Sequence, residues 1–257
     1  MGAFPTYAVV LAAGKGTRLH SALPKVLHPL CGRPMLEHIL VQLRALSLTQ
    51  ILVVVGDQAE AVRARFSEWP VEWVLQEQQL GTGHAVLMSE PWLREKTGSV
   101  LVLYGDGPLI TAARLRELLQ AREKSDAALA LITSRLDDPT GYGRVIRSPG
   151  KPLRIVEEKD ASPEQKEIRE ANPGYYCFDL PLLFSALHRL SDDNVQGEYL
   201  LTDTVGVLSR EGQTVVTIEA PAEEILGVND LSEMARAEEI LQRRVRTGNE
   251  ERGTRND

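Results

Sequence analysis

The chain has few cysteines, and its histidines do not cluster. Its 257 residues include only Cys31 and Cys177, which are far apart in the sequence. Disulfide frameworks and zinc sites need cysteines or histidines at short, recurrent spacings. The histidines show no such spacing either, and they are His20, His28, His38, His84 and His188. The sequence therefore favours two reduced thiols over a disulfide scaffold or a zinc site, and we assign no histidine a catalytic role.

An excess of positive charge is also lacking. The formal net charge is −7 and the sequence pI is about 5.4. Proteins that bind nucleic-acid backbones gather a strong positive excess on one face. The composition argues against a nucleic-acid partner, and any phosphate recognition is expected to be local.

Long apolar runs are absent from the sequence. No stretch approaches the roughly 20 apolar residues that a membrane-spanning helix needs. Residues 1–9 have no basic region followed by an apolar run and a small-residue cleavage site. We therefore expect a cytoplasmic protein that has no membrane partner.

What the sequence does contain is a regular alternation of strand-like and helix-like segments. Short β-rich runs at residues 7–11, 51–55, 71–75 and 100–104 are each followed by helical patterning. This order predicts a Rossmann-like α/β fold, in which helices cover both faces of a central, mostly parallel sheet. The 43% hydrophobic content is enough to bury a full core.

A glycine-containing loop follows the first predicted strand. Residues 11–19 read Leu-Ala-Ala-Gly-Lys-Gly-Thr-Arg-Leu, and such small residues allow backbone N–H groups to approach a triphosphate closely. Arg18 and Lys25 can neutralise phosphate oxygens. Neither G-x-x-x-x-G-K-[ST] nor G-x-G-x-x-G with a later acidic residue fits. Taken alone, the loop is equally compatible with a simple strand-to-helix turn.

Together with residues 23–28, Leu-Pro-Lys-Val-Leu-His, the loop resembles the signature of sugar-nucleotide pyrophosphorylases. The chain is most similar to the branch of bacterial N-acetylglucosamine-1-phosphate uridylyltransferases. The resemblance covers nearly the whole sequence, and its further segments lie at residues 76–84, 104–106, 141–144, 156–157, 172, 196–199 and 227–229.

This resemblance implies an Mg²⁺-dependent enzyme that joins UTP to N-acetylglucosamine 1-phosphate and releases pyrophosphate. The product, UDP-N-acetylglucosamine, would serve cell-wall and lipopolysaccharide synthesis. The site residues that the resemblance implies are Leu11, Ala12, Ala13, Gly14, Lys25, Gln76, Gly81 and Thr82 for the nucleotide; Tyr104, Gly105, Gly143, Glu157, Asn172 and Asn229 for the sugar; Asp106 and Asn229 for the metal; and Arg18 and Lys25 for catalysis.

Several of these residues also carry a chemical argument of their own. Asp106 follows a strand at the sheet edge where ligands bind, and a carboxylate there can hold Mg²⁺, although a lone Asp after a strand is more often a turn former. Gln76 offers both the donor and the acceptor that a pyrimidine edge needs. Thr82 could instead be the N-cap of a helix, and Glu157 taken singly would look like a solvated surface charge.

We expect one nucleotidyltransferase domain over residues 1–246. Its nucleotide half covers about 1–140, a sugar-binding lobe about 141–230 and a C-terminal helix 231–246, and 247–257 would form a flexible tail. In the family, a trimerising left-handed β-helix usually follows, but no such hexapeptide repeat occurs in this sequence. The oligomeric state therefore remains open.

The sequence departs from the family pattern at two positions. Gly107 stands where a larger residue is more usual, and Pro173 where a small polar residue is more usual. Gly107 would add backbone freedom beside the metal, and Pro173 would restrict Asn172. Both positions bear on sugar selectivity.

Three alternatives to this function are open. The same phosphate loop could serve another sugar 1-phosphate or dTTP. Cytidylyl transfer to an alcohol phosphate is a more distant alternative. A protein of another class, an inactive nucleotide-sensing scaffold, could retain the fold.

Overall fold

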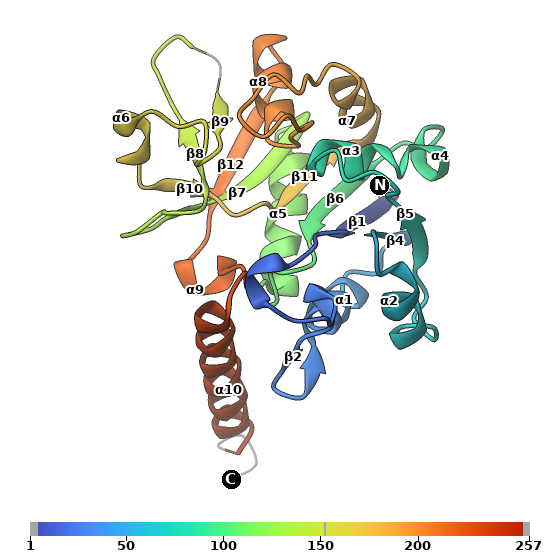
Figure 1. The fold of residues 1–257 in the computed structure, drawn as a ribbon. Helices are drawn as coiled ribbons and strands as arrows, with labels where there is room; N and C mark the ends of the chain where they lie inside the picture. The colour runs from blue at the N-terminus through green and yellow to red at the C-terminus, as the bar shows by residue number, and fades with distance from the viewer. Residues whose placement is uncertain (1–4, 152, 254–257) are drawn as a thin grey trace.

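The computed structural model describes residues 5–151 and 153–253 of the chain, with side chains up to residue 246. Within these residues ten strands form one sheet (Figure 1). Their order across the sheet is β5 (Glu72–Leu75), β4 (Gln50–Val55), β1 (Thr6–Ala12), β6 (Ser99–Tyr104), β11 (Tyr176–Asp179), β7 (Leu129–Arg135), β10 (Glu170–Asn172), β8 (Gly143–Ile146) and β9 (Arg154–Val156), with β12 (Val215–Glu219) paired to β7.

The four strands expected from the sequence form the parallel part of this sheet. β5, β4, β1 and β6 pair in parallel, so their carboxyl ends meet at one edge. β11 and the three strands from β10 to β9 run antiparallel to their neighbours, whereas β12 lies parallel to β7. The prediction of a mostly parallel central sheet is confirmed for the nucleotide half, and the remainder is mixed.

Helices cover both faces of the sheet (Figure 1). Alternate residues of β1 point to opposite sides: Ala8 and Val10 pack against α1 (Met35–Arg44), whereas Val9 faces the other side. The helices α2 (Ala59–Arg65) and α5 (Ala112–Lys124) share the face of α1; α3 (Thr82–Leu87), α7 (Leu180–Leu187) and α8 (Asp203–Arg210) cover the other. Each fully buried Val or Leu contributes about 1.5–3 kcal/mol to this packing.

The remaining elements are short. They are two 3₁₀ turns (Thr17–Leu19 and Lys25–Leu27), the hairpin of β2 (Pro29–Leu30) and β3 (Arg33–Pro34), and the helices α4 (Glu90–Leu93), α6 (Pro163–Lys166) and α9 (Ala222–Ile225). The thiol of Cys177 in β11 is buried, and that of Cys31 in the hairpin turn is exposed; both are free.

The boundary expected near residue 140 does not divide the sheet. β10, β8 and β9 extend it as an antiparallel arm, visible at the upper left of Figure 1. The chain then returns, and β11 inserts between β6 and β7. The two predicted halves therefore share one sheet, and both contribute residues to the apolar clusters on its two faces.

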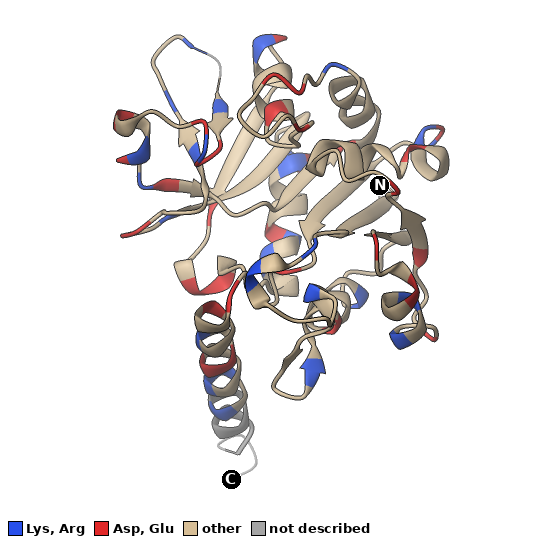
Figure 2. Cartoon of the chain, viewed as in Figure 1, with Lys and Arg blue, Asp and Glu red and all other residues tan. Residues whose placement is uncertain are grey.

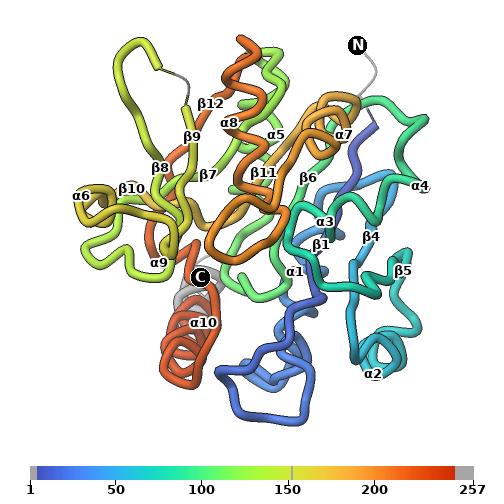
Figure 3. The backbone as a smooth tube through the Cα atoms, turned by 45° about the horizontal axis from the view of Figure 1, so that its top comes forward, coloured from blue at the N-terminus to red at the C-terminus, as the bar shows by residue number. Residues whose placement is uncertain are grey.

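The C-terminal helix α10 (Leu231–Gly253) is longer than predicted, because it continues through part of the expected flexible tail. Residues 254–257, the rest of that tail, lie outside the described residues. An apolar cluster that includes Leu30, Val228 and Ile240 packs the start of α10 against the β2–β3 hairpin. Figures 1 and 3 agree that α10 lies beside the N-terminal segment that follows β1.

Basic and acidic residues are interspersed over the molecule and along α10 (Figure 2). No helix among the described residues is both long and apolar enough to cross a membrane.

Candidate functional site

The loop after β1 holds two glycines that are required for different reasons. A Cβ on Gly14 would meet open space, so the backbone there stays accessible to a ligand. Gly16 has φ +61°, and a Cβ on it would lie 2.6 Å from the Cβ of Lys25. The second glycine thus lets the loop turn and lets Lys25 lie against it.

A pocket of about 550 Å³ opens at the carboxyl edge of the parallel strands. It is lined by every residue that the resemblance implied for the nucleotide, namely Leu11, Ala12, Ala13, Gly14, Lys25, Gln76, Gly81 and Thr82, and also by Lys15, Gly16, Thr17, Val26, Gln79, Ala85, Tyr104, Asp106 and Glu198. Arg18 does not line it: the residue is exposed on the 3₁₀ turn.

Lys25 and Asp106 line this pocket, and Lys25 also contacts Asn229. The Lys25 Nζ donates to Asp106 Oδ2 at 2.5 Å and to Asn229 Oδ1 at 2.8 Å. The Lys25 side chain is only 10% exposed. The two oxygens expected to hold the metal therefore converge on a single cationic atom, across 123 positions of sequence between residues 106 and 229.

Backbone contacts hold these two oxygens together. The N–H of Val228 donates to the carbonyl of Asp106 at 2.8 Å, which fixes the segment before α10 against the end of β6. The N–H of Asn229 donates to Glu233 at 2.6 Å, and that of Gly227 to the Tyr142 hydroxyl at 3.3 Å. Carboxylate and amide oxygens are ligands that Mg²⁺ accepts, so the pair fits a divalent cation.

A second cluster contains three of the expected sugar residues. Asn172 in β10 lies directly opposite Gly143 in β8. A Cβ on Gly143 would lie 3.4 Å from Glu157 Oε2. The other oxygen of Glu157, Oε1, accepts a hydrogen bond from the buried Thr202 hydroxyl at 2.8 Å. Burial raises the pKa of Glu157, and nearby acidic residues add to this rise, whereas the Thr202 hydrogen bond lowers it.

The Asn172 side chain is partly unsatisfied. It is 7% exposed, and its Nδ2 donates to the Tyr176 hydroxyl at 2.7 Å. Within the described residues its buried Oδ1 has no hydrogen-bond partner. An unpaired buried acceptor costs about 1–3 kcal/mol, so this oxygen needs a partner such as a water, an ion or a ligand.

Tyr104 is the last residue of β6, and Gly105 follows it. The N–H of Gly105 donates to the carbonyl of Leu11 at 2.7 Å, which ties the end of β6 to β1. Burial, followed by the charge of Glu157, raises the pKa of Tyr104, so its phenol stays neutral. Gly174 has φ +90°, and a Cβ on it would overlap the Tyr104 ring. Gly174 therefore makes room for that ring.

The structure corrects two expectations about residues 76–82. Thr82 is the first residue of α3 and Gly81 is its N-cap, so Thr82 is not a capping residue. Its hydroxyl instead accepts from the N–H of Leu201 at 2.9 Å. Gln76 does not present a free donor, because its Nε2 lies 3.1 Å from both the Gly81 carbonyl and His84 Nδ1.

The reason for glycine at position 107 also differs from the expectation. Gly107 does not have a positive φ, so backbone freedom is not what requires it. A Cβ there would overlap the hydroxyl of the buried Tyr175, which donates to the Gly107 carbonyl at 3.2 Å. Tyr175 fills the space that a larger residue at 107 would take.

Sequence reasoning missed two residues that organise the site. Gln79 donates to the carbonyl of Ala13 at 2.7 Å and so anchors the glycine loop. Thr202 holds Glu157. No local signal marks either one, because each acts on a segment far away in the sequence.

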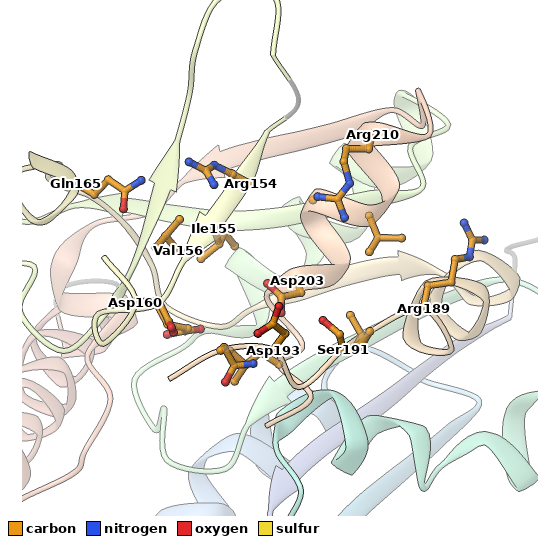
Figure 4. Close-up of a pocket in the computed structure, with 16 residues that line it drawn as sticks. Arg154, Ile155, Val156, Asp160, Gln165, Arg189, Ser191, Asp193, Asp203 and Arg210 are labelled. Atoms are coloured by element: carbon orange, nitrogen blue, oxygen red, sulfur yellow. The ribbon is translucent and has the colours of Figure 1, made fainter. Parts of the chain in front are cut away.

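Figure 4 shows a separate pocket of about 480 Å³, and Glu157 is one of the residues that line it. Arginines and carboxylates line it together, among them Arg154, Arg210, Asp160 and Asp203. Neither the glycine loop nor Asp106 borders this pocket. The pocket beside Gly14 is therefore the one that the residues expected to bind the nucleotide line.

Comparison with known proteins identifies the family. Residues 8–200 match the family described as MobA-like NTP transferase domain. The chain belongs to that family. Membership confirms the nucleotidyltransferase domain that the resemblance implied.

Relatives within this group are close in sequence but longer. The protein named Bifunctional protein GlmU from Limosilactobacillus fermentum is 50% identical over 242 residues, and the protein of that name from Brevibacillus brevis is 48% identical over 249 residues. These alignments cover 93% and 96% of this chain but 53% and 54% of the relatives. The chain thus spans about half the length of the curated relatives it matches.

Two solved structures share the fold at low identity. A structure of UDP-glucose pyrophosphorylase complexed with UDP-glucose has a TM-score of 0.75 at 15% identity, and covers 94% of this chain and 100% of that one. A putative glucose-1-phosphate thymidylyltransferase from Bacillus anthracis, in complex with a sucrose, has a TM-score of 0.72 at 18% identity, with coverage of 91% and 94%. Both establish the architecture of an NTP transferase domain.

Proposed function

We propose that the chain transfers a uridylyl group from UTP to N-acetyl-α-D-glucosamine 1-phosphate, giving UDP-N-acetylglucosamine and pyrophosphate, with Mg²⁺ as cofactor. The observation that carries the proposal is the convergence of Asp106 and Asn229 on Lys25, which lines the glycine-loop pocket. The identity to proteins named Bifunctional protein GlmU supports the choice of substrates.

We propose that the two parts of the chain bind different substrates. Residues of about 1–140 supply the nucleotide pocket, and Gly143, Glu157 and Asn172 from the later part read the sugar, within one domain. Asn172 Oδ1, which has no partner within the described residues, and Glu157 Oε2, which lies beside Gly143, would offer acceptors for the acetamido N–H and the sugar hydroxyls.

The attacking sugar phosphate is already anionic, so the reaction needs no enzyme base or nucleophile. Lys25 would neutralise charge on the α-phosphate and the departing pyrophosphate. Lys15 and Arg18, on the glycine loop after β1, would contribute further positive charge. Asp106 and Asn229 would hold Mg²⁺, which would supply charge neutralisation and alignment of the two substrates. The remaining contribution of the chain is to hold the reacting groups in line.

The proposed location is the cytoplasm, which the exposed free thiol of Cys31 supports, because such thiols persist in reducing compartments.

A substrate panel tests the function. Pyrophosphate release is measured with UTP, dTTP and CTP against N-acetylglucosamine, glucosamine and glucose 1-phosphates, with Mg²⁺ and with a chelator. We expect UTP with the acetylated sugar to give the highest kcat/KM and the chelator to abolish turnover. A higher kcat/KM for another nucleotide and sugar phosphate would identify that pair as the substrates. UTP binding without any turnover would favour a nucleotide-sensing protein.

A further inference from the structure

The side-chain amide of Gln76 has both of its hydrogens engaged by the protein. Its Nε2 lies 3.1 Å from the Gly81 carbonyl oxygen and 3.1 Å from His84 Nδ1. The residue lines the nucleotide pocket and is 3% exposed. Within the described chain no group donates to Gln76 Oε1. That oxygen is the one polar atom of the side chain left for a ligand.

The orientation of this amide follows from its neighbours. A backbone carbonyl can only accept, so the Nε2 end must face Gly81. With one hydrogen used there, the second is directed to His84 Nδ1, which must then carry a lone pair. Desolvation lowers the pKa of His84, which favours the neutral imidazole that this hydrogen bond requires. The ring proton then resides on Nε2.

We propose that His84 is a positioning residue for base selection: together with the Gly81 carbonyl, it turns both amide hydrogens of Gln76 inward, so that a bound base meets Oε1 as an acceptor alone. The inference rests on the proposed function in one respect, namely that a pyrimidine nucleotide occupies this pocket. This positioning role of His84 could not be predicted from the spacing of the histidines in the sequence.

An acceptor at this point distinguishes between pyrimidines. The N3 atom of uracil or thymine carries a hydrogen and can donate to Oε1. The N3 atom of cytosine carries a lone pair, so two acceptors would face each other and the buried oxygen would stay unpaired. Sites that leave a buried polar group unpaired reject the wrong ligand strongly. UTP and dTTP are therefore accepted and CTP is rejected, by about tenfold or more.

The test compares two substitutions of His84, one that keeps a hydrogen-bond acceptor at the position of Nδ1 and one that removes it. His84→Asn keeps an acceptor, because the Asn Oδ1 occupies the same covalent position as the His Nδ1. His84→Leu removes the acceptor and keeps an apolar body of similar width. Dissociation constants for UTP and CTP are measured by calorimetry on the full chain without any sugar phosphate, and melting temperatures are recorded alongside.

Wild type is expected to bind UTP at least tenfold more tightly than CTP. His84→Leu should reduce this ratio at least threefold, and His84→Asn should retain it. An unchanged ratio in His84→Leu overturns the inference. An equal loss in His84→Asn does so as well, because the effect would then come from packing. If His84→Leu fails to fold, His84→Met, whose side chain has no nitrogen or oxygen acceptor, takes its place with the same expectation.

The two proposals can fail separately. Because the binding ratio is measured without sugar, a protein that discriminates UTP from CTP as described but releases no pyrophosphate with any sugar phosphate refutes the proposed function alone. A protein that turns over UTP and binds CTP equally well refutes the role of His84 alone. A protein that binds no pyrimidine nucleotide refutes both.

Discussion

Lys25 and Asp106 form an ion pair at the point where the two proposed metal ligands meet. The ammonium lies 2.5 Å from Asp106 Oδ2 and also donates to Asn229 Oδ1. Asp106 and Asn229 are the residues that would hold Mg²⁺, and Lys25 contacts an oxygen of each. The ammonium would therefore compete with a divalent cation for these two oxygens. The phosphates of a bound nucleotide would give Lys25 another anionic partner.

Lys25→Met should therefore strengthen metal binding in the absence of nucleotide. The substitution removes the competing charge and leaves both oxygens free, and it keeps a side chain of similar length. We expect roughly a tenfold lower dissociation constant for Mn²⁺, about the contribution of one charged hydrogen bond. The free Mn²⁺ signal in electron paramagnetic resonance measures it. Adding Asp106→Asn to this variant should abolish the gain, and an unchanged constant in Lys25→Met would contradict the competition.

Asp106→Asn should reduce pyrophosphate release much more than it reduces stability. Asn keeps the size of the side chain and an oxygen that can accept from Lys25, but it lacks the charge that holds a cation. We expect kcat to fall roughly 10²–10³-fold and the melting temperature to stay within about 4 °C. The exposed Asp138→Asn serves as a control that should leave the rate unchanged. Near-wild-type turnover in Asp106→Asn would remove its assignment as a metal ligand.

Glu157→Gln should raise the melting temperature at neutral pH and weaken sugar binding. The pKa of Glu157 in the folded protein lies above its ordinary value of 4.5. Its ionised form therefore destabilises the fold at neutral pH, and this penalty disappears as the pH falls through the folded pKa to the unfolded one. Gln removes the penalty and can still accept from Thr202.

Scanning calorimetry at two pH values checks this expectation. At pH 7.5 the variant should melt roughly 2–4 °C above wild type, and the difference should shrink towards pH 4.5. Glu158→Gln is the matched control with the opposite sign, since Glu158 forms an ion pair with the buried Arg144 at 2.7 Å and its loss leaves that charge unpaired. A Glu157→Gln variant that melts below wild type at pH 7.5 would show that ionised Glu157 stabilises the fold.

The sequence was informative wherever the signal was local. The alternation of strands and helices predicted the parallel strands β1, β4, β5 and β6, and the motif at residues 11–19 predicted the loop that lines the pocket. The side-chain periods of strands and helices are properties of neighbouring residues, so such segments can be read directly. The placement of Asp106 at the carboxyl edge follows from the same rule.

Contacts between segments that are distant in the sequence could not be predicted from it. Nothing in residues 141–230 indicates that β11 inserts between β6 and β7, because strand order depends on packing rather than on local pattern. The use of both Gln76 donors within the protein, the anchoring of Ala13 by Gln79 and the hydrogen bond from Thr202 to Glu157 are likewise tertiary facts. Residue identity gives the chemical capacity of such groups, and only the fold shows which part is left for a ligand.

Thr202→Val should weaken binding of the sugar phosphate without affecting UTP. Val matches the shape of Thr and removes the hydroxyl that holds Glu157 Oε1. Without that hydrogen bond the carboxylate is less fixed, and its pKa rises further because the donated hydrogen bond lowers it in wild type. We expect KM for N-acetylglucosamine 1-phosphate to increase roughly tenfold, and the acid side of its pH profile to shift to higher pH, while KM for UTP stays unchanged.

Thr204→Val separates this effect from a general loss of stability. Thr204 is fully buried two residues further along, and its hydroxyl donates to the Leu201 carbonyl at 2.6 Å rather than to Glu157. Both variants lose one buried hydrogen bond, so both should melt lower, but only Thr202→Val should change KM for the sugar phosphate and its pH profile. Thr202→Ser, which restores a hydroxyl, should recover most of the affinity. Equal KM values in the two valine variants would mean that Thr202 supports the fold and does not position Glu157.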